Sequence, residues 1–292
     1  MKKMVKLVST LAFVGLFMYN SQAQDDANKA IELYNQTLQA AQSGDFATAI
    51  AKSKEAYDLA QKVEGAEETK ANLEKMIPQL YLNKAKKDLE AGKFDEALAG
   101  LKQAEDEAKK FNDAETLKNA AATVNDVHLK QAKNLYDNND FAGAIAAFDK
   151  ALALDTTDAQ VYLLKANSLL KKGDTQTALE TFEKTKAVAD TTKKADIAKQ
   201  ATAQIANIYK KMAGDAQKSK KWADVVSNAE KALEYKPDDA TAPKLIDLGN
   251  YQQGAALQAS NKAKACQFFK KVKYDEKLKA NAAQALKALG CN

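Results

Sequence analysis

Apolar residues recur three and four positions apart along most of this chain, and a short phrase interrupts them at intervals. The phrase reads Gly44-Asp45-Phe46-Ala47-Thr48-Ala49 and returns as Gly92-Lys93-Phe94-Asp95-Glu96-Ala97. It returns again from positions 139 and 173, and weaker copies start at 220 and 260. The apolar spacing is typical of helices that bury one face, and the phrase is typical of a turn between two helices. The sequence therefore predicts an all-α fold of about five to six antiparallel helix hairpins.

Each position of the phrase has a predicted structural role. Glycine permits the left-handed conformation that ends a helix, and the aspartate after it caps the next helix. The alanine lets two helices come close, and an aromatic residue four positions later shares its helix face. The predicted caps are Asp45, Asp140 and Asp174, the corner aromatics Phe46, Phe94, Phe141 and Trp222, the contact alanines Ala49, Ala97, Ala144, Ala178 and Ala265, and the core phenylalanines Phe148, Phe182 and Phe269.

The intervals between the phrases are 48, 47, 34, 47 and 40 residues. The interval of 34 is the period of the tetratricopeptide repeat. Ala144, Phe148 and Ala151 match the second-helix pattern of that family, Pro237 matches its closing proline, and small first-helix residues recur at Ala85, Ala132, Ala166 and Ala213. With these residues the chain resembles the tetratricopeptide repeat family over residues 27 to 273. The resemblance implies a right-handed α-solenoid.

The longer intervals exceed the family period by 13 or 14 residues in three cases. This excess predicts first helices of about 25 residues or a short extra helix before each, since one turn takes 3.6 residues. Pro78 favours a kink or a break within one of these helices. Residues 24–274 are thus expected to form the repeat domain, and residues 275–292 a C-terminal capping helix with a polar outer face.

The first 23 residues have the pattern of a secretory signal peptide. Lys2, Lys3 and Lys6 precede an apolar run that ends at Met18, and small residues follow at 21–23. The run is too short for a membrane span of about 20 residues, so stable membrane insertion is not expected after cleavage. We therefore expect an exported protein of the bacterial cell envelope, in the periplasm or outside the cell, that begins near Gln24.

Charge argues against a nucleic-acid partner. The chain has 44 basic and 39 acidic residues, and every basic residue is lysine. Arginine is the side chain that most often reads phosphates and base edges in a bidentate manner, and it is absent from the sequence. Acidic residues alternate with the lysines, which indicates a solvated mixed surface.

Few residues suggest catalysis or metal binding. His128 is the single histidine and lies where other first helices have tyrosine, so we expect it to pack in the core. One histidine cannot supply the three or four ligands of a metal site. The acidic pairs Glu67-Glu68 and Asp238-Asp239 lie at expected helix starts, where they favour the helix dipole. The prediction is a protein without enzymatic activity, cofactor or metal.

Cys266 and Cys291 are the two cysteines of the chain. In an exported protein they favour a disulfide that attaches the capping helix to the last hairpin. Two independent thiols are the alternative, since a sequence does not give the distance between Cβ atoms.

The resemblance further implies that the first helices line a concave surface that holds an extended peptide. The family positions for this surface correspond here to Tyr34, Leu82, Lys86, Lys133, Tyr136, Asn167, Lys171 and Lys210. The prediction is a protein–protein interaction scaffold with an unidentified protein or peptide partner. The alternative is a structural or assembly subunit that acts through the edges of the solenoid or by self-association.

Overall fold

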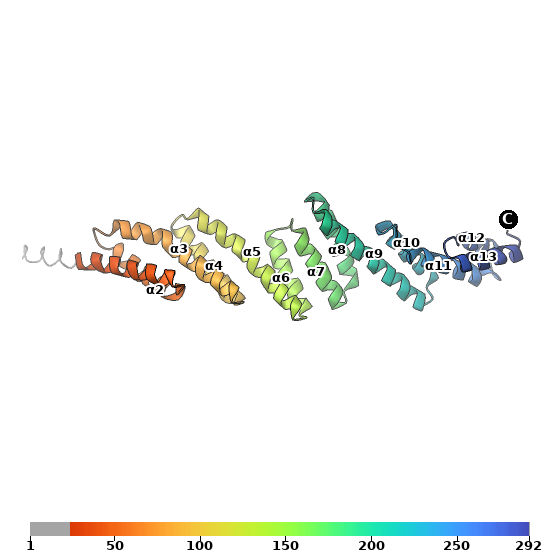
Figure 1. Cartoon of the computed structure of the whole chain (residues 1–292), viewed down its shortest axis with the longest axis horizontal. Coiled ribbons are helices and arrows are strands. Elements are labelled where there is room, and N and C mark those ends of the chain that lie inside the picture. The colour runs from red at the N-terminus through yellow and green to blue at the C-terminus, as the bar shows by residue number, and fades with distance from the viewer. Residues whose placement is uncertain (1–23, 292) are drawn as a thin grey trace, which may run out of the picture. The chain divides into compact units, whose positions relative to one another are not determined.

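A computed structural model describes residues 24–291, and every regular element in that range is helical. The signal-peptide prediction for residues 1–23 lies outside the described residues. The chain divides into two compact units at Gln131 and Ala132, inside one helix. The all-α prediction is confirmed (Figure 1).

The first unit begins with a helix over 24–42 and continues with α2 (Phe46–Ala60), α3 (Glu67–Glu90), α4 (Phe94–Lys110) and the larger part of α5 (Ala114–Asp137). Consecutive helices pack together, α2 on α3 and α3 on α4. Each helix therefore buries its apolar face against its neighbours in sequence, as expected for stacked hairpins.

The second unit holds the end of α5 and eight further helices among the described residues. Here also each helix from α6 onward packs on the next, and α7, α9, α11 and α13 contact one another in succession. This second set of contacts joins alternate helices, so the hairpins stack with their first helices side by side. The helices are α6 (Phe141–Leu154), α7 (Ala159–Lys172), α8 (Thr175–Thr191), α9 (Ala195–Lys218), α10 (Trp222–Tyr235), α11 (Ala242–Leu257), α12 (Lys262–Phe269) and α13 (Glu276–Leu289).

Three first helices are long, which confirms the prediction of longer first helices over that of a short extra helix before each. α3, α5 and α9 each have 24 residues and run without interruption, so no separate short helix precedes them. Pro78 lies buried inside α3 and does not break it. Proline removes one backbone hydrogen bond of a helix, and the packing of the flanking Ile77 and Leu80 in the core of the first unit offsets that loss.

The turns between helices share one backbone arrangement. At the turn after α7, Gly173 has a φ of 94° and Asp174 donates its amide to the carbonyl of Leu169. The same hydrogen bond and a positive φ occur at Asn139 (62°) and Lys220 (56°), where the sequence has no glycine. The hairpin therefore adopts the left-handed turn whether or not the residue is glycine. At Lys220 the Cβ atom makes this backbone conformation energetically less favourable.

The predicted helix caps are confirmed. The side chains of Asp45, Asp140 and Asp174 accept hydrogen bonds from the amides of the third residue along, at 3.1, 2.9 and 3.2 Å. Where lysine replaces aspartate, as at Lys93 and Lys221, no side chain caps the helix.

The predicted core is also confirmed. All five contact alanines and the four first-helix alanines have no exposed surface, and Phe148, Phe182 and Phe269 are the three largest fully buried side chains among the described residues. The corner aromatics are half-buried, and Phe46 and Phe94 pack against the core of the first unit. Helices that meet through small residues lie so close together that only glycine fits at position 249 of α11. A Cβ at Gly249 would lie 2.6 Å from Cγ2 of Val226.

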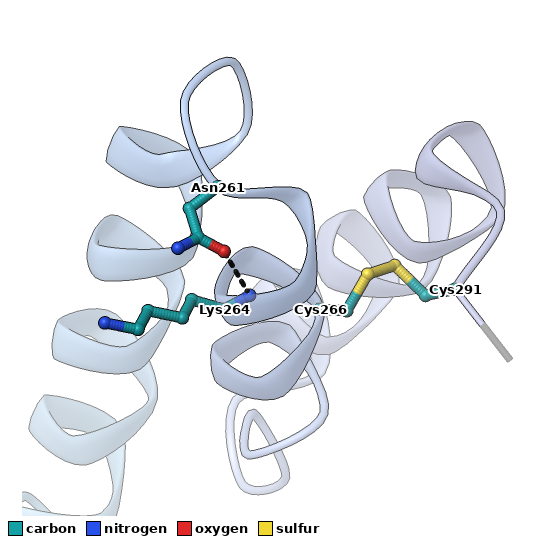
Figure 2. Close-up of a disulfide and its surroundings, with 4 residues drawn as sticks. All are labelled: Asn261, Lys264, Cys266 and Cys291. Carbon is teal, nitrogen blue, oxygen red and sulfur yellow. Dashed lines mark hydrogen bonds between the residues drawn. A yellow bond between two sulfur atoms is a disulfide. The ribbon is translucent and has the colours of Figure 1, made fainter.

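A disulfide joins Cys266 of α12 to Cys291 after α13, and the two Cα atoms are 5.8 Å apart (Figure 2). Beside it, the side chain of Asn261 caps α12 by accepting the Lys264 amide at 3.0 Å. Since the bridge closes a loop over 25 residues of sequence separation, the chain-entropy estimate gives it about 3 kcal/mol of stabilisation. It fastens α13 to the last hairpin.

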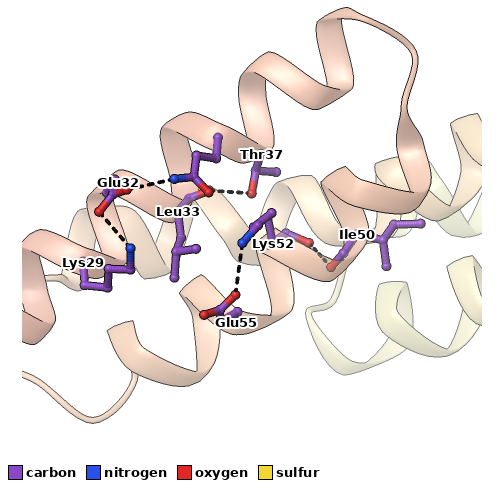
Figure 3. A network of polar contacts seen from close by, with 9 residues as sticks. Lys29, Glu32, Leu33, Thr37, Ile50, Lys52 and Glu55 are labelled. Carbon is purple, nitrogen blue, oxygen red and sulfur yellow. Dashed lines mark hydrogen bonds and ion pairs between the residues drawn. The ribbon is translucent and has the colours of Figure 1, made fainter.

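Polar side chains within the first hairpin are satisfied locally. Thr37, which is fully buried where later first helices have alanine, donates its hydroxyl to the Leu33 carbonyl at 2.8 Å (Figure 3). On the outer side, Glu32 accepts from Lys29 and Gln36, each at 2.9 Å. These contacts stay within one helix, so they stabilise it without fixing its neighbours.

Candidate partner-binding surface

Three of the predicted binding residues are exposed lysines on first helices: Lys86 on α3, Lys133 on α5 and Lys171 on α7. In the described part of the chain, none of the three ammonium groups has a carboxylate within 4.0 Å. Other first-helix lysines differ, because Lys84 of α3 pairs with Asp88 at 2.7 Å and Lys211 of α9 with Asp215 at 3.0 Å. Lys86, Lys133 and Lys171 are therefore available to an anionic group of a partner.

Tyr34, Tyr136 and Asn167 are half-buried. The ring of Tyr136 meets the edge of the Phe141 ring at a centroid distance of 5.4 Å, which fixes its orientation next to the turn. Each of the three side chains presents part of its surface to solvent. An aromatic face and an amide of this kind suit contacts with a peptide backbone or an apolar side chain.

The other two predicted residues have structural roles. Leu82 is only 4% exposed and belongs to the core of the first unit, so its side chain packs inside rather than on an accessible surface. α3 packs against both α2 and α4, and the buried cluster that contains Leu82 includes residues from all three helices. Lys210 of α9 is a quarter exposed, and its ammonium lies 2.7 Å from the carboxylate of Asp239.

The Lys210–Asp239 pair joins α9 to the segment before α11. Asp239 is 6% exposed and also accepts the amides of Thr241 and Ala242, at 2.9 and 3.0 Å. Burial raises the pKa of Asp239, but the hydrogen bonds from Lys210 and the two amides outweigh it and lower the pKa to about 2. The charged form is thus favoured in the folded protein, and Lys210 is engaged by it.

The predicted residues fall into two groups. Tyr34, Leu82 and Lys86 belong to the first unit, and the residues from Lys133 onward belong to the second. Within the second unit, Lys133 and Asn167 hold the same position of consecutive hairpins, 34 residues apart. The candidate surface is therefore best defined there, by Lys133, Tyr136, Asn167 and Lys171.

His128 is 9% exposed and lies in α5, in the core position expected from the sequence. Between residues 24 and 291, no three His, Cys, Asp or Glu side chains gather in a group that could hold a metal ion. No helix in that range is long and apolar enough to cross a bilayer.

A structural carboxylate without a signal in the sequence is Asp247 of α11. It is fully buried and accepts the amides of Lys273, Tyr274 and Asp275, at 2.8 Å for the first and 2.6 Å for the last. Three amide donors satisfy the buried charge and fix the segment that leads into α13. The position lies 26 residues before its first partner, and no local motif signals such a contact.

The family profile of the tetratricopeptide repeat matches residues 135–205, from the end of α5 to the middle of α9. No curated protein matches the chain.

Among solved structures, MamA from Desulfovibrio magneticus RS-1 (residues 41 to its end) is 20% identical, with 70% of this chain and 96% of that chain covered and a TM-score of 0.32. YrrB, described as a TPR protein with an unusual peptide-binding site, is 17% identical, with 70% and 91% covered and a TM-score of 0.30. The TPR2AB domain of yeast Sti1, in complex with pHSP90, is 16% identical, with 93% and 96% covered and a TM-score of 0.31.

TM-scores of this size are too low to relate the arrangement of this chain to theirs. The hairpins matched by the family profile are those in which Phe148 and Phe182 fill the core. The profile match supports tetratricopeptide repeats over residues 135–205, within the all-helical part of the chain that the structure describes.

Proposed function

We propose that this protein is a non-catalytic interaction scaffold of the bacterial cell envelope. It binds a protein or peptide on the exposed side of its first helices, centred on Lys133, Tyr136, Asn167 and Lys171. Export follows from the signal-like pattern of residues 1–23.

This proposal rests on two exposed first-helix lysines whose ammonium groups form no ion pair within the described part of the chain. Lys133 and Lys171 are exposed, and no carboxylate of the described chain lies within 4.0 Å of either ammonium. A carboxylate of a partner can therefore bind them without displacing an internal ion pair. Such contacts steer association and fix register, and they suit an acidic side chain or the C-terminal carboxylate of a peptide.

The neighbouring side chains add contacts of a different kind. Tyr136 is held against Phe141 and offers a rigid aromatic face, while the half-buried Asn167 offers an amide that donates and accepts hydrogen bonds. Tyrosine is enriched at binding hot spots because it buries a large area at a small entropic cost. The expected ligand is thus an extended, acidic segment.

Affinity capture tests the proposal. The purified protein would be used to capture partners from the envelope fraction of the source organism, and recovery would be quantified by mass spectrometry. Lys133→Glu/Lys171→Glu should reduce recovery of a specific partner at least about tenfold, since it turns attraction into repulsion.

The matched control is Lys150→Glu/Lys184→Glu, which makes the same charge change at exposed lysines of the second helices α6 and α8. This control should retain the partner. Equal recovery by all three proteins would refute the proposed surface. Fractionation, with sequencing of the mature N-terminus, tests export: a chain that begins at Met1 in the cytoplasm would exclude it.

A further inference from the structure

Residues 262–287 of the second unit carry a lysine-rich surface. They contain eight lysines, all exposed, and two acidic residues. Asp275 caps α13 by accepting the Leu278 amide at 3.0 Å, and Glu276 lies 3.7 Å from Lys279. The lysine surface consists of Lys262, Lys264, Lys270, Lys271, Lys273, Lys277, Lys279 and Lys287.

The first unit carries a surface of the opposite sign. Residues 24–32 and 58–68 lie together because Ala27, Ala30, Ala60 and Ala66 form one buried cluster. These two segments contain seven carboxylates and two lysines. Lys29 and Glu32 pair at 2.9 Å (Figure 3). The acidic surface consists of Asp25, Asp26, Glu32, Asp58, Glu64, Glu67 and Glu68.

The two surfaces are matched in charge. Residues 24–131 have a formal net charge of −5, and residues 244–291 have one of +6. Each surface also exposes a large hydrophobic side chain, Ile31 at 41% in the acidic surface and Tyr274 at 54% in the lysine surface. These are two of three such side chains among the described residues, the third being Leu154. An apolar contact surrounded by opposite charges is typical of a specific interface.

We propose that the lysine surface of one copy of this chain docks on the acidic surface of a second copy. Complementary charges favour rapid association and exclude the alternative in which like surfaces meet. The contact is heterologous, because two different surfaces meet, so each added copy leaves one surface of each kind unoccupied and an open chain of copies can grow. The inference goes beyond the proposed scaffold function and uses none of its lysines, so the two can fail independently.

Sedimentation velocity of the purified protein over a range of concentrations measures this self-association. At about 50 mM salt we expect concentration-dependent oligomers, and at about 500 mM salt a shift to monomer, because screening shortens the reach of exposed charges. Lys273→Glu/Lys277→Glu lowers the formal net charge of residues 262–287 from +6 to +2, and Glu64→Lys/Glu68→Lys changes that of residues 24–32 and 58–68 from −5 to −1. Each variant alone should weaken self-association at least about tenfold.

A mixture of the two variants tests most directly whether the two surfaces bind each other. The Lys273→Glu/Lys277→Glu variant retains the unaltered acidic surface, and the Glu64→Lys/Glu68→Lys variant retains the unaltered lysine surface. These two surfaces remain complementary, so the mixture should associate again. Lys150→Glu/Lys184→Glu is the charge-matched control and should behave as wild type, while circular dichroism should show unchanged helix content in all variants.

Three results would overturn the proposal: a wild-type protein that sediments as a monomer at low salt, a mixture that does not associate, or an equal loss in the control. A lysine variant that loses only binding to phosphatidylserine-containing vesicles would assign the lysine surface to membranes instead.

Discussion

The Lys210–Asp239 ion pair gives the sharpest prediction for stability. Asp239→Asn removes the charge but keeps an oxygen that can accept the amides of Thr241 and Ala242. The pKa of Asp239 is lowered from 3.8 to about 2 in the folded protein, against burial, by Lys210 and these amides. At about 1.36 kcal/mol for each pKa unit, the charged form contributes about 2 kcal/mol at pH 7.

The pH dependence has a definite sign. Because the folded pKa lies below the unfolded one, the contribution is fully present above about pH 4 and is lost as pH falls towards 2. The free energy difference between wild type and Asp239→Asn should therefore be about 2 kcal/mol at pH 7 and about half of that at pH 3.

The assay is urea unfolding followed by the fluorescence of Trp222, the single tryptophan. Trp222 starts α10, which packs against both α9, the helix of Lys210, and α11, the helix that follows Asp239. A local probe is needed because stacked repeats do not always unfold as one unit. Asp238→Asn, at an exposed neighbour, is the control and should stay within about 0.5 kcal/mol of wild type. Equal stability of the two variants at pH 7, or a difference that does not shrink on acidification, would refute the reasoning.

Three further predictions concern the backbone and the C-terminal hairpin. Gly249→Ala should destabilise by about 1–3 kcal/mol because its Cβ has no room, whereas Gly214→Ala in α9 meets nothing within 4 Å and should stabilise by about 0.5–1 kcal/mol in thermal melts. Lys220→Gly should stabilise by about 1 kcal/mol by relieving a positive φ, and a lower melting temperature would contradict this. Cys266→Ser/Cys291→Ser should cost about 3 kcal/mol, and added reductant should then leave the variant unchanged while destabilising wild type.

The sequence predicts those features that depend on spacing along one helix. The alanine seams and the phenylalanines Phe148, Phe182 and Phe269 follow from helical periodicity, and the structure buries every one of them. Aspartate caps likewise depend on residues three positions apart, as Asp140 shows. These contacts are local, so the order of residues determines them.

Contacts between distant segments are not predictable in this way. The burial of Asp247 against the amides of residues 273–275, and the engagement of Lys210 by Asp239, depend on how hairpins stack. The resemblance places Leu82 on the concave surface of the family, whereas its side chain is buried in the core of the first unit here. The left-handed conformation of Lys220 cannot be predicted from the position of a glycine, because two backbone hydrogen bonds stabilise this turn with a lysine in place.

The central claim is that the first helices of the second unit hold the partner, and site-specific photo-crosslinking tests it most directly. A photoreactive amino acid at position 167, on α7, should crosslink the captured partner, while the same group at the exposed position 230, on α10, should not. Crosslinks from position 230 but not from position 167 would contradict the account.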